Sequence, residues 1–298
     1  PVARCYSASL LVLMACQTPN NVPSVENWNL LLAGKVAVIT GGGEGIGRGI
    51  SKLFAEHGAI VEIAEINSEL ASSVVNEITA AGGKARAHII DVRNEKDVTE
   101  LKKNILGVHE QVDVLVNNVG DYRPLVRFID SSPESWKKMY DINLHHVFLV
   151  THAFLPSMVD GNGGSIINIH SVEAMRAYPG DPIYGAMKAA VSHFSTCLAS
   201  GFGKDGVRVN GIGVDLTQTP QVDYISGYED VDDLWEAWAP IGRLGWPEDQ
   251  ARVALFLASD LSAFVTGHNI PVDGGTHAGG GWFFSPEAQR FVNRPKTL

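Results

Sequence analysis

The chain of 298 residues is poor in cysteine and has no excess of basic residues. Its three cysteines, Cys5, Cys16 and Cys197, show no CxxC or zinc-ligand spacing, so we expect neither a disulfide framework nor a bound metal, and a reducing compartment is favoured. The 23 Lys and Arg residues are outnumbered by 33 Asp and Glu, which gives a net charge of -10. Binding to nucleic acid requires clustered cations that neutralise phosphates, so no nucleic-acid partner is expected.

A long apolar run is also missing from the N-terminal region. The stretch at residues 10–16 (LLVLMAC) is too short to span a bilayer, which takes roughly 20 residues. We therefore expect no membrane span. The stretch follows Arg4 and ends at Cys16 in a faint likeness of a bacterial lipoprotein cleavage box, so a signal segment is one alternative. The preferred interpretation of residues 1–33 is an N-terminal extension of uncertain role, packed on the domain or on a neighbouring subunit.

What the sequence does contain is an ordinary globular composition, with 45% hydrophobic and 19% charged residues. The strand-like segments are 35–40, 60–66, 85–91, 112–120, 165–171, 207–214 and 268–275, and they alternate with helical segments at 45–58, 71–83, 95–107, 133–159, 182–203 and 247–258. This alternation predicts an α/β fold, a Rossmann-type doubly wound parallel sheet of about seven strands with helices on both faces. No repeat or linker divides the region, so we expect a single domain over residues 34–275 and an aromatic tail at 276–298.

A glycine-rich turn, TGGGEGIG at residues 40–47, lies between the first strand-like segment and the first helical one. Gly41 permits the tight turn, Gly45 lets the backbone approach a pyrophosphate, and Gly47 lets the helix pack close to the strand. The helix that begins near Ile46 offers free N–H groups and the positive end of its dipole to phosphates. The position of the turn predicts a dinucleotide-binding site rather than an ordinary glycine-rich turn.

Two acidic residues bear on which dinucleotide binds. Glu65 stands near the end of the second strand-like segment, where a carboxylate accepts hydrogen bonds from the adenosine-ribose hydroxyls and repels a 2′-phosphate. Glu44, inside the glycine turn, adds a second negative charge where a 2′-phosphate would need Arg or Lys. Either residue alone could be an ordinary solvated acid; together they predict NAD as the cofactor rather than NADP.

Ser171, Tyr184 and Lys188 form a second pattern, in which the tyrosine and the lysine are the first and last residues of YGAMK. On a helix this spacing places both side chains on one face. A tyrosine hydroxyl has an ordinary pKa of about 10, and a nearby ammonium favours its ionised form. Ser171 ends a strand-like segment and can hydrogen-bond to the reacting oxygen. The pattern predicts a proton-transfer group that works beside a hydride carrier.

The chain from about residue 34 to 275 resembles the main subfamily of the short-chain dehydrogenases/reductases. The matching features are TGGGEGIG, Asp91-Val92, NNVG at 117–120, Asn143, Ser171, Tyr184 with Lys188, and VDGG at 272–275. The resemblance implies that Asn143 holds a water linking Lys188 to solvent, and that Lys188 also binds the nicotinamide ribose. It further implies that Asp91 and Val92 border the adenine and that Asn118 lies at the adenosine ribose.

The chain departs from the family pattern after the sixth strand-like segment, where Val214-Asp215 replaces the usual Pro-Gly. Thr217 takes the place of an Ile or Val whose backbone meets the nicotinamide carboxamide. Thr219 matches the usual threonine at the carboxamide or phosphate. By resemblance, both threonines are cofactor-binding residues, on a loop whose sequence is altered.

The resemblance also implies a lid over the active site at about residues 216–246. Aromatic residues in this segment suit an apolar ring, although an amphipathic helix packed on the domain would explain them equally well. The tail residues 282–284 (WFF) could close the pocket of their own or a neighbouring subunit, or pack on the surface. The candidate substrate residues are Val172, Glu173, Tyr178, Tyr224 and Trp235.

These observations predict an NAD-dependent enzyme that interconverts a secondary alcohol and a ketone. An apolar substrate is expected, such as a hydroxysteroid, a terpenoid or an aromatic alcohol. An NADPH-dependent ketoreductase of acyl thioesters is the alternative enzyme. Two alternatives come from other classes: a protein that senses the NAD redox state without turnover, and a structural subunit for a partner. Sensors of this kind commonly lose the tyrosine or the lysine, and both residues are present here.

The expected partners are a small-molecule alcohol or ketone and further copies of the chain. The resemblance implies a homo-oligomer, dimer or tetramer, formed through the helical segments at 133–159 and 182–203 and the last strand. A cytoplasmic location is expected because a nicotinamide enzyme normally works beside the cytosolic cofactor pool. The N-terminal extension leaves export or targeting as the alternative.

Overall fold

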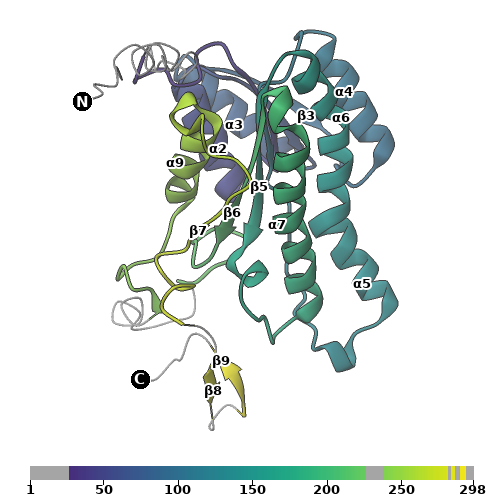
Figure 1. Ribbon diagram of the computed structural model, residues 1–298, viewed down its shortest axis with the longest axis vertical. Helices are drawn as coiled ribbons and strands as arrows, with labels where there is room; N and C mark the ends of the chain where they lie inside the picture. Colours follow the sequence, from purple (N-terminus) through teal and green to yellow (C-terminus); the bar gives the residue numbers. More distant parts are fainter. Residues whose placement is uncertain (1–26, 226–237, 281–282, 286–288, 293–298) are drawn as a thin grey trace, which may run out of the picture.

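The computed structural model describes residues 27–225, 238–280, 283–285 and 289–292. Its centre is a parallel sheet in the order β3-β2-β1-β4-β5-β6-β7 (Figure 1). The strands are β1 (Val36–Thr40), β2 (Ile60–Glu65), β3 (Lys84–Ile89), β4 (Val114–Asn117), β5 (Gly164–Ser171), β6 (Val207–Val214) and β7 (Asn269–Val272). The predicted doubly wound α/β fold is confirmed, and the strand order reverses between β1 and β4, which both pair in parallel with their neighbours.

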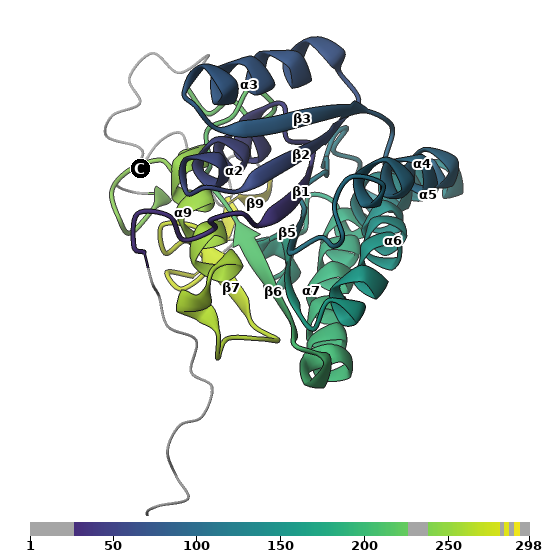
Figure 2. The ribbon, with the colours of Figure 1, turned by 90° about the horizontal axis from the view of Figure 1, so that it is seen from above.

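Helices cover both faces of this sheet (Figure 2). One face carries α2 (Gly45–Glu56), α3 (Ser68–Ala80) and α9 (Pro247–Ala258), and the other carries α4 (Glu95–Leu106), α5 (Pro133–Tyr140), α6 (His146–Asp160) and α7 (Pro182–Phe202). Phe54 is completely buried in the core on the first face and Phe154 in the core on the second. Because both faces are covered, the strands are continuous apolar runs, and all five residues of β1 are buried.

Two helices differ from the sequence prediction. α3 begins at Ser68 rather than at residue 71, because the side chain of Asn67 accepts two N–H groups of its first turn. The single helix expected over 133–159 is divided by a π-helical turn, Asp141–His145, between α5 and α6. A π turn changes the direction of the side chains that it carries and often occurs at functional sites. Asn143 lies in this turn.

The chain ends and loops also differ. The strand expected over 112–120 stops at Asn117, and the tail contains an antiparallel hairpin of β8 (Phe283–Ser285) and β9 (Arg290–Val292) that was not predicted. In Figure 1 this hairpin lies beyond the carboxyl ends of the parallel strands.

Within the described residues, one helical stretch, Pro133–Asp160, has the length and composition of a membrane span. Half of its apolar window is buried in the fold, as is also found in core helices.

Candidate active site

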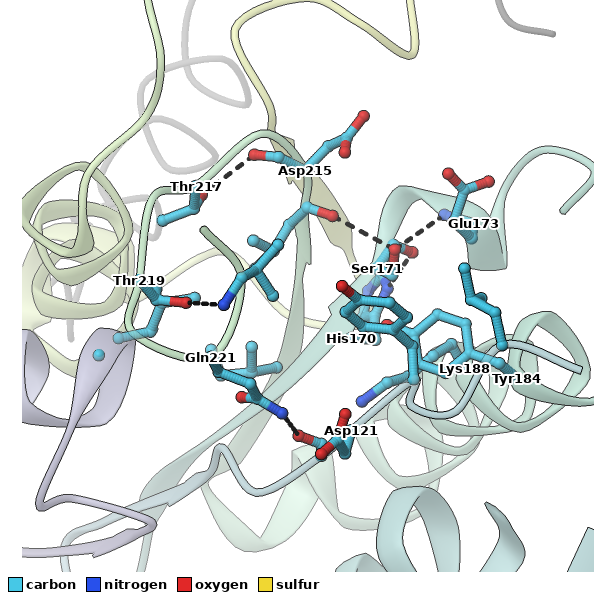
Figure 3. A pocket seen from close by; sticks show the side chains of 18 of the residues that line it. Asp121, His170, Ser171, Glu173, Tyr184, Lys188, Asp215, Thr217, Thr219 and Gln221 are labelled. Carbon is cyan, nitrogen blue, oxygen red and sulfur yellow. Dashed lines mark hydrogen bonds between the residues drawn. The ribbon is translucent and has the colours of Figure 1, made fainter. Parts of the chain in front are cut away.

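A cavity of about 1030 Å³ opens at the carboxyl ends of the strands (Figure 3). An open α/β sheet forms such a crevice where its strand order reverses, because the loops on the two sides run in opposite directions. Loops after β1, β2, β4, β5 and β6 line it, together with α7 and the tail hairpin. The predicted residues that line it are Gly41, Glu44, Gly45, Ile46, Glu65, Asn118, Ser171, Glu173, Tyr178, Tyr184, Lys188, Thr217, Thr219 and Tyr224.

The glycine turn has a backbone conformation and a packing that require glycine. Gly41 and Gly45 have φ angles of 62° and 53°, in the left-handed region that side-chain-bearing residues rarely adopt. A Cβ on Gly47 would lie 2.0 Å from the Gly41 carbonyl oxygen, so only glycine lets α2 pack this close to β1. The N-terminus of α2 has no side-chain cap, so its first N–H groups are available to an anion.

Glu65 is held rigidly at the end of β2, where it is 8% exposed. Its carboxylate accepts the N–H of Gly43 at 3.2 Å and those of Ile66 and Asn67 at 2.9 and 3.0 Å. These bonds keep the carboxylate against the glycine turn, where it lines the cavity. The residue is therefore both part of the turn and part of the cavity wall.

The end of the cavity formed by the loops after β1 and β2 is acidic. Glu44 is exposed there, and Glu65 lines the same cavity. Two of the described lining residues are lysine or arginine, Arg127 and Lys188, and they come from the loop after β4 and from α7. A 2′-phosphate at the acidic end would thus face the carboxylates of Glu44 and Glu65. Among the described lining residues, the loops after β1 and β2 offer no lysine or arginine to neutralise it.

Ser171, Tyr184 and Lys188 converge in the cavity (Figure 3). Ser171 ends β5, and its Oγ donates to the Val214 carbonyl at 3.3 Å and accepts the Glu173 N–H at 3.2 Å. Tyr184 and Lys188 lie one turn apart on α7, with the ammonium nitrogen 5.6 Å from the centre of the tyrosine ring. The fold thus brings together three residues that the sequence suggested as a proton-transfer group.

Burial has the largest effect on the pKa values of Tyr184 and Lys188. It raises the pKa of the Tyr184 phenol far above its ordinary value, whereas hydrogen bonding with Ser171 lowers that pKa. The charge of Glu173 and the neighbouring tyrosines raise it again. Burial also lowers the pKa of the Lys188 ammonium to about 8, against the opposing effect of Asp121. The lowering of the tyrosine pKa that we expected from the lysine is not among the main effects; burial has the largest effect and raises that pKa.

Asn143 is completely buried behind this group. Its Nδ2 donates to the Asp121 carbonyl at 2.7 Å, and its Oδ1 accepts the Asp121 N–H at 3.2 Å. A Cβ on Gly120 would lie 2.6 Å from Lys188 Nζ and 3.1 Å from Asn143 Oδ1, so the ammonium and the amide meet at this glycine. Asn143 therefore lies close to Lys188, and its part in a water relay stays a prediction.

Some predicted residues do not line the described cavity. Asp91 and Val92 follow β3, and Asp91 pairs with Arg93 at 2.6 Å. Val172 is completely buried beside the site rather than in its wall. Trp235 and the central part of the expected lid, 226–237, lie outside the described residues, as does the tail tryptophan.

Several residues that line the cavity were not predicted from the sequence. Asp121 and Tyr122 directly follow the NNVG run, and Tyr122 packs edge-on against Tyr184 with ring centres 6.3 Å apart. The rule that sites form at the carboxyl ends of parallel strands would have found these two. Gln221 hydrogen-bonds to the loop after β4 at 3.0 Å, and Phe291 reaches the cavity from the tail hairpin. Contacts between segments so distant in the chain leave no local signal.

Comparison with known proteins gives consistent matches. A family model described as enoyl-(acyl carrier protein) reductase matches residues 41–277. The chain is 37% identical over 248 residues to a 3-oxoacyl-(acyl-carrier-protein) reductase of Chlamydia muridarum, covering 83% of this chain and 99% of that relative. It is 40% identical over 248 residues to a 2,5-dichloro-2,5-cyclohexadiene-1,4-diol dehydrogenase of Sphingobium indicum, with 83% and 98% covered. A solved 7-alpha-hydroxysteroid dehydrogenase complexed with NADH and 7-oxo glycochenodeoxycholic acid superposes with a TM-score of 0.76 at 35% identity, with 83% and 96% covered.

Proposed function

Since this chain belongs to the short-chain dehydrogenase/reductase family, we propose that it uses NAD to interconvert a neutral, apolar secondary alcohol and its ketone. The chain is an oxidoreductase of that family, and its relatives include a reductase and two dehydrogenases. The observation that carries the finer proposal is the chemistry of the cavity wall. One part of the wall is acidic and another is aromatic, and Ser171, Tyr184 and Lys188 belong to the same cavity.

The acidic part supports NAD as the cofactor. Glu65 already accepts three backbone N–H groups and has lone pairs left for a ribose hydroxyl. A 2′-phosphate would place negative charge beside this buried carboxylate, where water screens charges poorly. Gly41, Gly45 and the first turn of α2 would hold the pyrophosphate. The dinucleotide therefore fits the residues present, and the form without a 2′-phosphate fits them better.

The residues of the proton-transfer group have distinct parts in the proposed reaction. Bound NAD would supply the hydride acceptor, which in its oxidised form carries a positive charge. As the phenolate, Tyr184 takes the proton of the substrate hydroxyl as a general base, and in the reverse direction the phenol returns the proton as an acid. Ser171 hydrogen-bonds to the same oxygen and orients it. Lys188, whose pKa is about 8, is mainly protonated at neutral pH, so its charge favours the phenolate.

The aromatic part of the wall supports a ring-bearing substrate. Tyr122 and Tyr178 pack edge-on against Tyr184, with ring centres 6.3 and 5.6 Å away. Tyr224 and Phe291 line the same cavity from the loop after β6 and from the tail hairpin. Such a wall stabilises an apolar ring by about 25 cal/mol for each Å² of apolar surface removed from water.

The charges of the wall support an uncharged substrate. Asp121, Glu173 and Asp215 all line the cavity, whereas the arginines that pair with them are not among its described lining residues. A carboxylate on the substrate would therefore meet more negative than positive charge. The names of two relatives agree with an alcohol on a ring, since one is a cyclohexadiene-diol dehydrogenase and another a hydroxysteroid dehydrogenase. We therefore place a cyclic secondary alcohol first among the substrate classes.

A ketoreductase of acyl thioesters is the second candidate, because a 37% identical relative is a 3-oxoacyl-(acyl-carrier-protein) reductase. In carrier-bound acyl thioesters the acyl group is attached to a linker that contains a phosphate, and proteins bind phosphates with arginine and lysine. Among the described lining residues outside the proton-transfer group, Arg127 is the basic side chain available, and it pairs with Asp130 at 2.7 Å. The described cavity wall thus favours the uncharged alcohol.

The proposed function is tested by a screen of alcohols with both cofactors. The full chain is expected to reduce NAD with at least one steroid, terpenoid or aromatic secondary alcohol, and to prefer NAD to NADP by at least about tenfold in kcat/KM, which is ~1.4 kcal/mol. The measurement is the absorbance of the reduced nicotinamide. An acetoacetyl thioester with NADPH tests the second candidate, and faster turnover there would reverse the ranking. Binding of NAD without turnover of any alcohol or ketone would point to the sensing role.

Glu44→Arg is expected to raise kcat/KM for NADP by about tenfold while changing that for NAD by less than about threefold. Glu44 is exposed and makes no capping hydrogen bond, so its replacement leaves the glycine turn intact. Glu65 would be a poor choice, because it holds backbone N–H groups of the turn. Glu44→Gln serves as the matched variant and should fall between the two. An unchanged cofactor ratio in the arginine variant would mean that no ribose phosphate comes near this residue.

We also propose that the enzyme is a cytoplasmic homo-oligomer. Phe148 of α6 and Phe194 of α7 pack edge-on with ring centres 4.8 Å apart, and Tyr140 and Met187 join the same cluster. All four side chains are only partly buried within one chain. A dimer or tetramer that pairs these helices would cover them, and light scattering on the purified chain measures its state.

A further inference from the structure

Arg176 lies where the loops after three neighbouring strands meet. Its Nη2 donates to Glu173 Oε1 and to Asp215 Oδ2, both at 2.9 Å. Its Nη1 donates to the Thr276 carbonyl at 3.2 Å. These partners come from the loops after β5, β6 and β7 respectively. The arginine side chain is 10% exposed and the two carboxylates 7% and 8%, so water competes little for these bonds. We call Arg176 with Glu173 and Asp215 the arginine clamp.

The clamp joins the two segments that hydrogen-bond to the Ser171 hydroxyl. The N–H of Glu173 donates to Ser171 Oγ at 3.2 Å, and that oxygen donates to the carbonyl of Val214 at 3.3 Å. Glu173 is therefore bound twice, through its backbone by the serine and through its side chain by the arginine. Val214 immediately precedes Asp215, so the segment after β6 is also bound twice. The serine binds its backbone at Val214, and the arginine binds its side chain at Asp215. A shift of either segment would turn the serine hydroxyl.

The loop after β6 contains a strained backbone position, and hydrogen bonds of Asp215 restrain it. Leu216 has a φ of 42°, in the left-handed region that is costly for a residue with a side chain. Its N–H donates to Asp215 Oδ1 at 2.8 Å, and Thr276 Oγ1 donates to Asp215 Oδ2 at 2.8 Å. Asp215 belongs to the Val-Asp pair that replaces the usual Pro-Gly. Where proline restricts a loop through its ring, this loop is restricted by a carboxylate that bridges three segments.

The arginine also balances charge beside the reacting phenol. Glu173 and Asp215 both line the cavity, and the charge of Glu173 raises the pKa of Tyr184. Without the guanidinium, two nearly buried carboxylates would oppose the phenolate more strongly. The other titratable groups that line the cavity around the phenol include His170 in β5, Tyr122 and Asp121 after β4, Tyr178 after β5, Tyr224 after β6, and Lys188 on α7.

We propose that Arg176 is a positioning residue of this enzyme: it ties the loops after β5, β6 and β7 together and so aims the Ser171 hydroxyl at the reacting oxygen. The kinetic half of this proposal rests on the proposed function, whereas the geometric half does not. Two separate experiments therefore test it.

The first experiment is a crystal structure of Arg176→Met, which requires no substrate. We expect the loop after β6 to move and the Ser171 hydroxyl to lose the bond to Glu173, to Val214 or to both. Arg176→Lys keeps the charge but cannot reach all three partners, and it offers the same comparison should the methionine variant fail to fold. A variant structure that keeps both serine bonds at their present 3.2 and 3.3 Å overturns the proposal, whatever the enzyme oxidises.

The second experiment compares kinetics on an alcohol that the unaltered chain oxidises. In Arg176→Met we expect kcat to fall about 10- to 100-fold with KM changed less than about threefold, because a small misplacement of a catalytic group costs this much. The rise of kcat with pH should move to higher pH in Arg176→Met and stay in place in Arg176→Lys, which retains the positive charge and should recover part of kcat.

Arg208→Met is the matched control. Arg208 also binds backbone carbonyls, those of Leu257 at 2.8 Å and Ser259 at 3.2 Å, but it does so near the amino end of β6, away from the cavity. Its loss should lower thermal stability and leave kcat unchanged. Unaltered kcat in a folded Arg176→Met, or an equal loss in Arg208→Met, overturns the positioning role. Absence of turnover in the unaltered chain would instead contradict the proposed function, and the crystal structure would then decide on Arg176.

Discussion

Tyr184→Phe is expected to lower kcat for alcohol oxidation by about 1000-fold, within the range of about 100- to 10000-fold that general acid–base catalysis contributes. The substitution removes only the hydroxyl that we propose as the proton acceptor. The ring keeps its edge-on contacts with Tyr122 and Tyr178, whose centres are 6.3 and 5.6 Å away, so the wall of the cavity should hold its shape. The measurement is the initial rate with the best alcohol of the screen, in both directions.

The affinity of the variant for NADH shows whether its lower kcat comes from the missing hydroxyl or from a disturbed structure. Fluorescence titration should give a dissociation constant for Tyr184→Phe within about threefold of the unaltered chain, because the glycine turn and Glu65 are untouched. Tyr140→Phe is the matched control; it makes the same chemical change on α5, in a helix cluster outside the described cavity wall, and should turn over normally. Retention of more than about a tenth of kcat in Tyr184→Phe would assign the proton transfer to another group.

Lys188→Met is expected to lower kcat by at least about 100-fold and, in the same molecule, to raise the free energy of unfolding. The lysine is 5% exposed, and burial lowers its pKa from 10.5 to about 8. A shift of this size corresponds to about 3 kcal/mol that folding loses by burying the charged form, which is an upper bound for the gain on substitution. Methionine fills a similar volume without a charge. Urea unfolding and turnover, measured on the same preparation, check both halves.

The dependence on pH identifies the cause of the gain. The folded pKa of Lys188 lies below that of the unfolded chain, so the unfolded state binds more protons between pH 8 and 10.5 and the unaltered protein gains stability as pH rises through this window. The advantage of Lys188→Met should therefore be full below pH 8 and shrink toward pH 10.5. Lys204→Met, at an exposed position, removes the same charge and should show no such advantage. A constant difference across this window would assign the gain to packing.

Local patterns in the sequence were sufficient for the elements and for much of the site. The apolar runs at β1 and β4 are continuous because helices cover both faces of the sheet. Such uninterrupted apolar runs can be recognised in the sequence without a structure. The glycine turn and the spacing of Tyr184 and Lys188 are also local, since each depends on a single turn or a single helix face. For the same reason, Ser171 at the end of β5 could be named as their partner, and the cavity contains all three.

Other features depend on contacts between distant segments. The π turn at Asn143 interrupts a stretch with uniform helical periodicity, and the amide that occupies it bonds to Asp121 of another loop. The large effect of burial on the pKa of Tyr184 was not predicted from the sequence, because no residue spacing reveals burial. The tail hairpin that brings Phe291 to the cavity likewise has no signal in its own residues.

By itself, the sequence determined the α/β architecture, the position of the glycine turn and the residues of the proposed proton-transfer group, because each of these depends on neighbours within a few positions along the chain. Tertiary structure alone decided what surrounds them. It showed that Asp215, which the sequence marks only as a departure from the family pattern, is bound through Arg176 to Glu173. Charges and hydrogen bonds act through space, so the environment that sets a pKa or aims a hydroxyl exists only after the chain has folded.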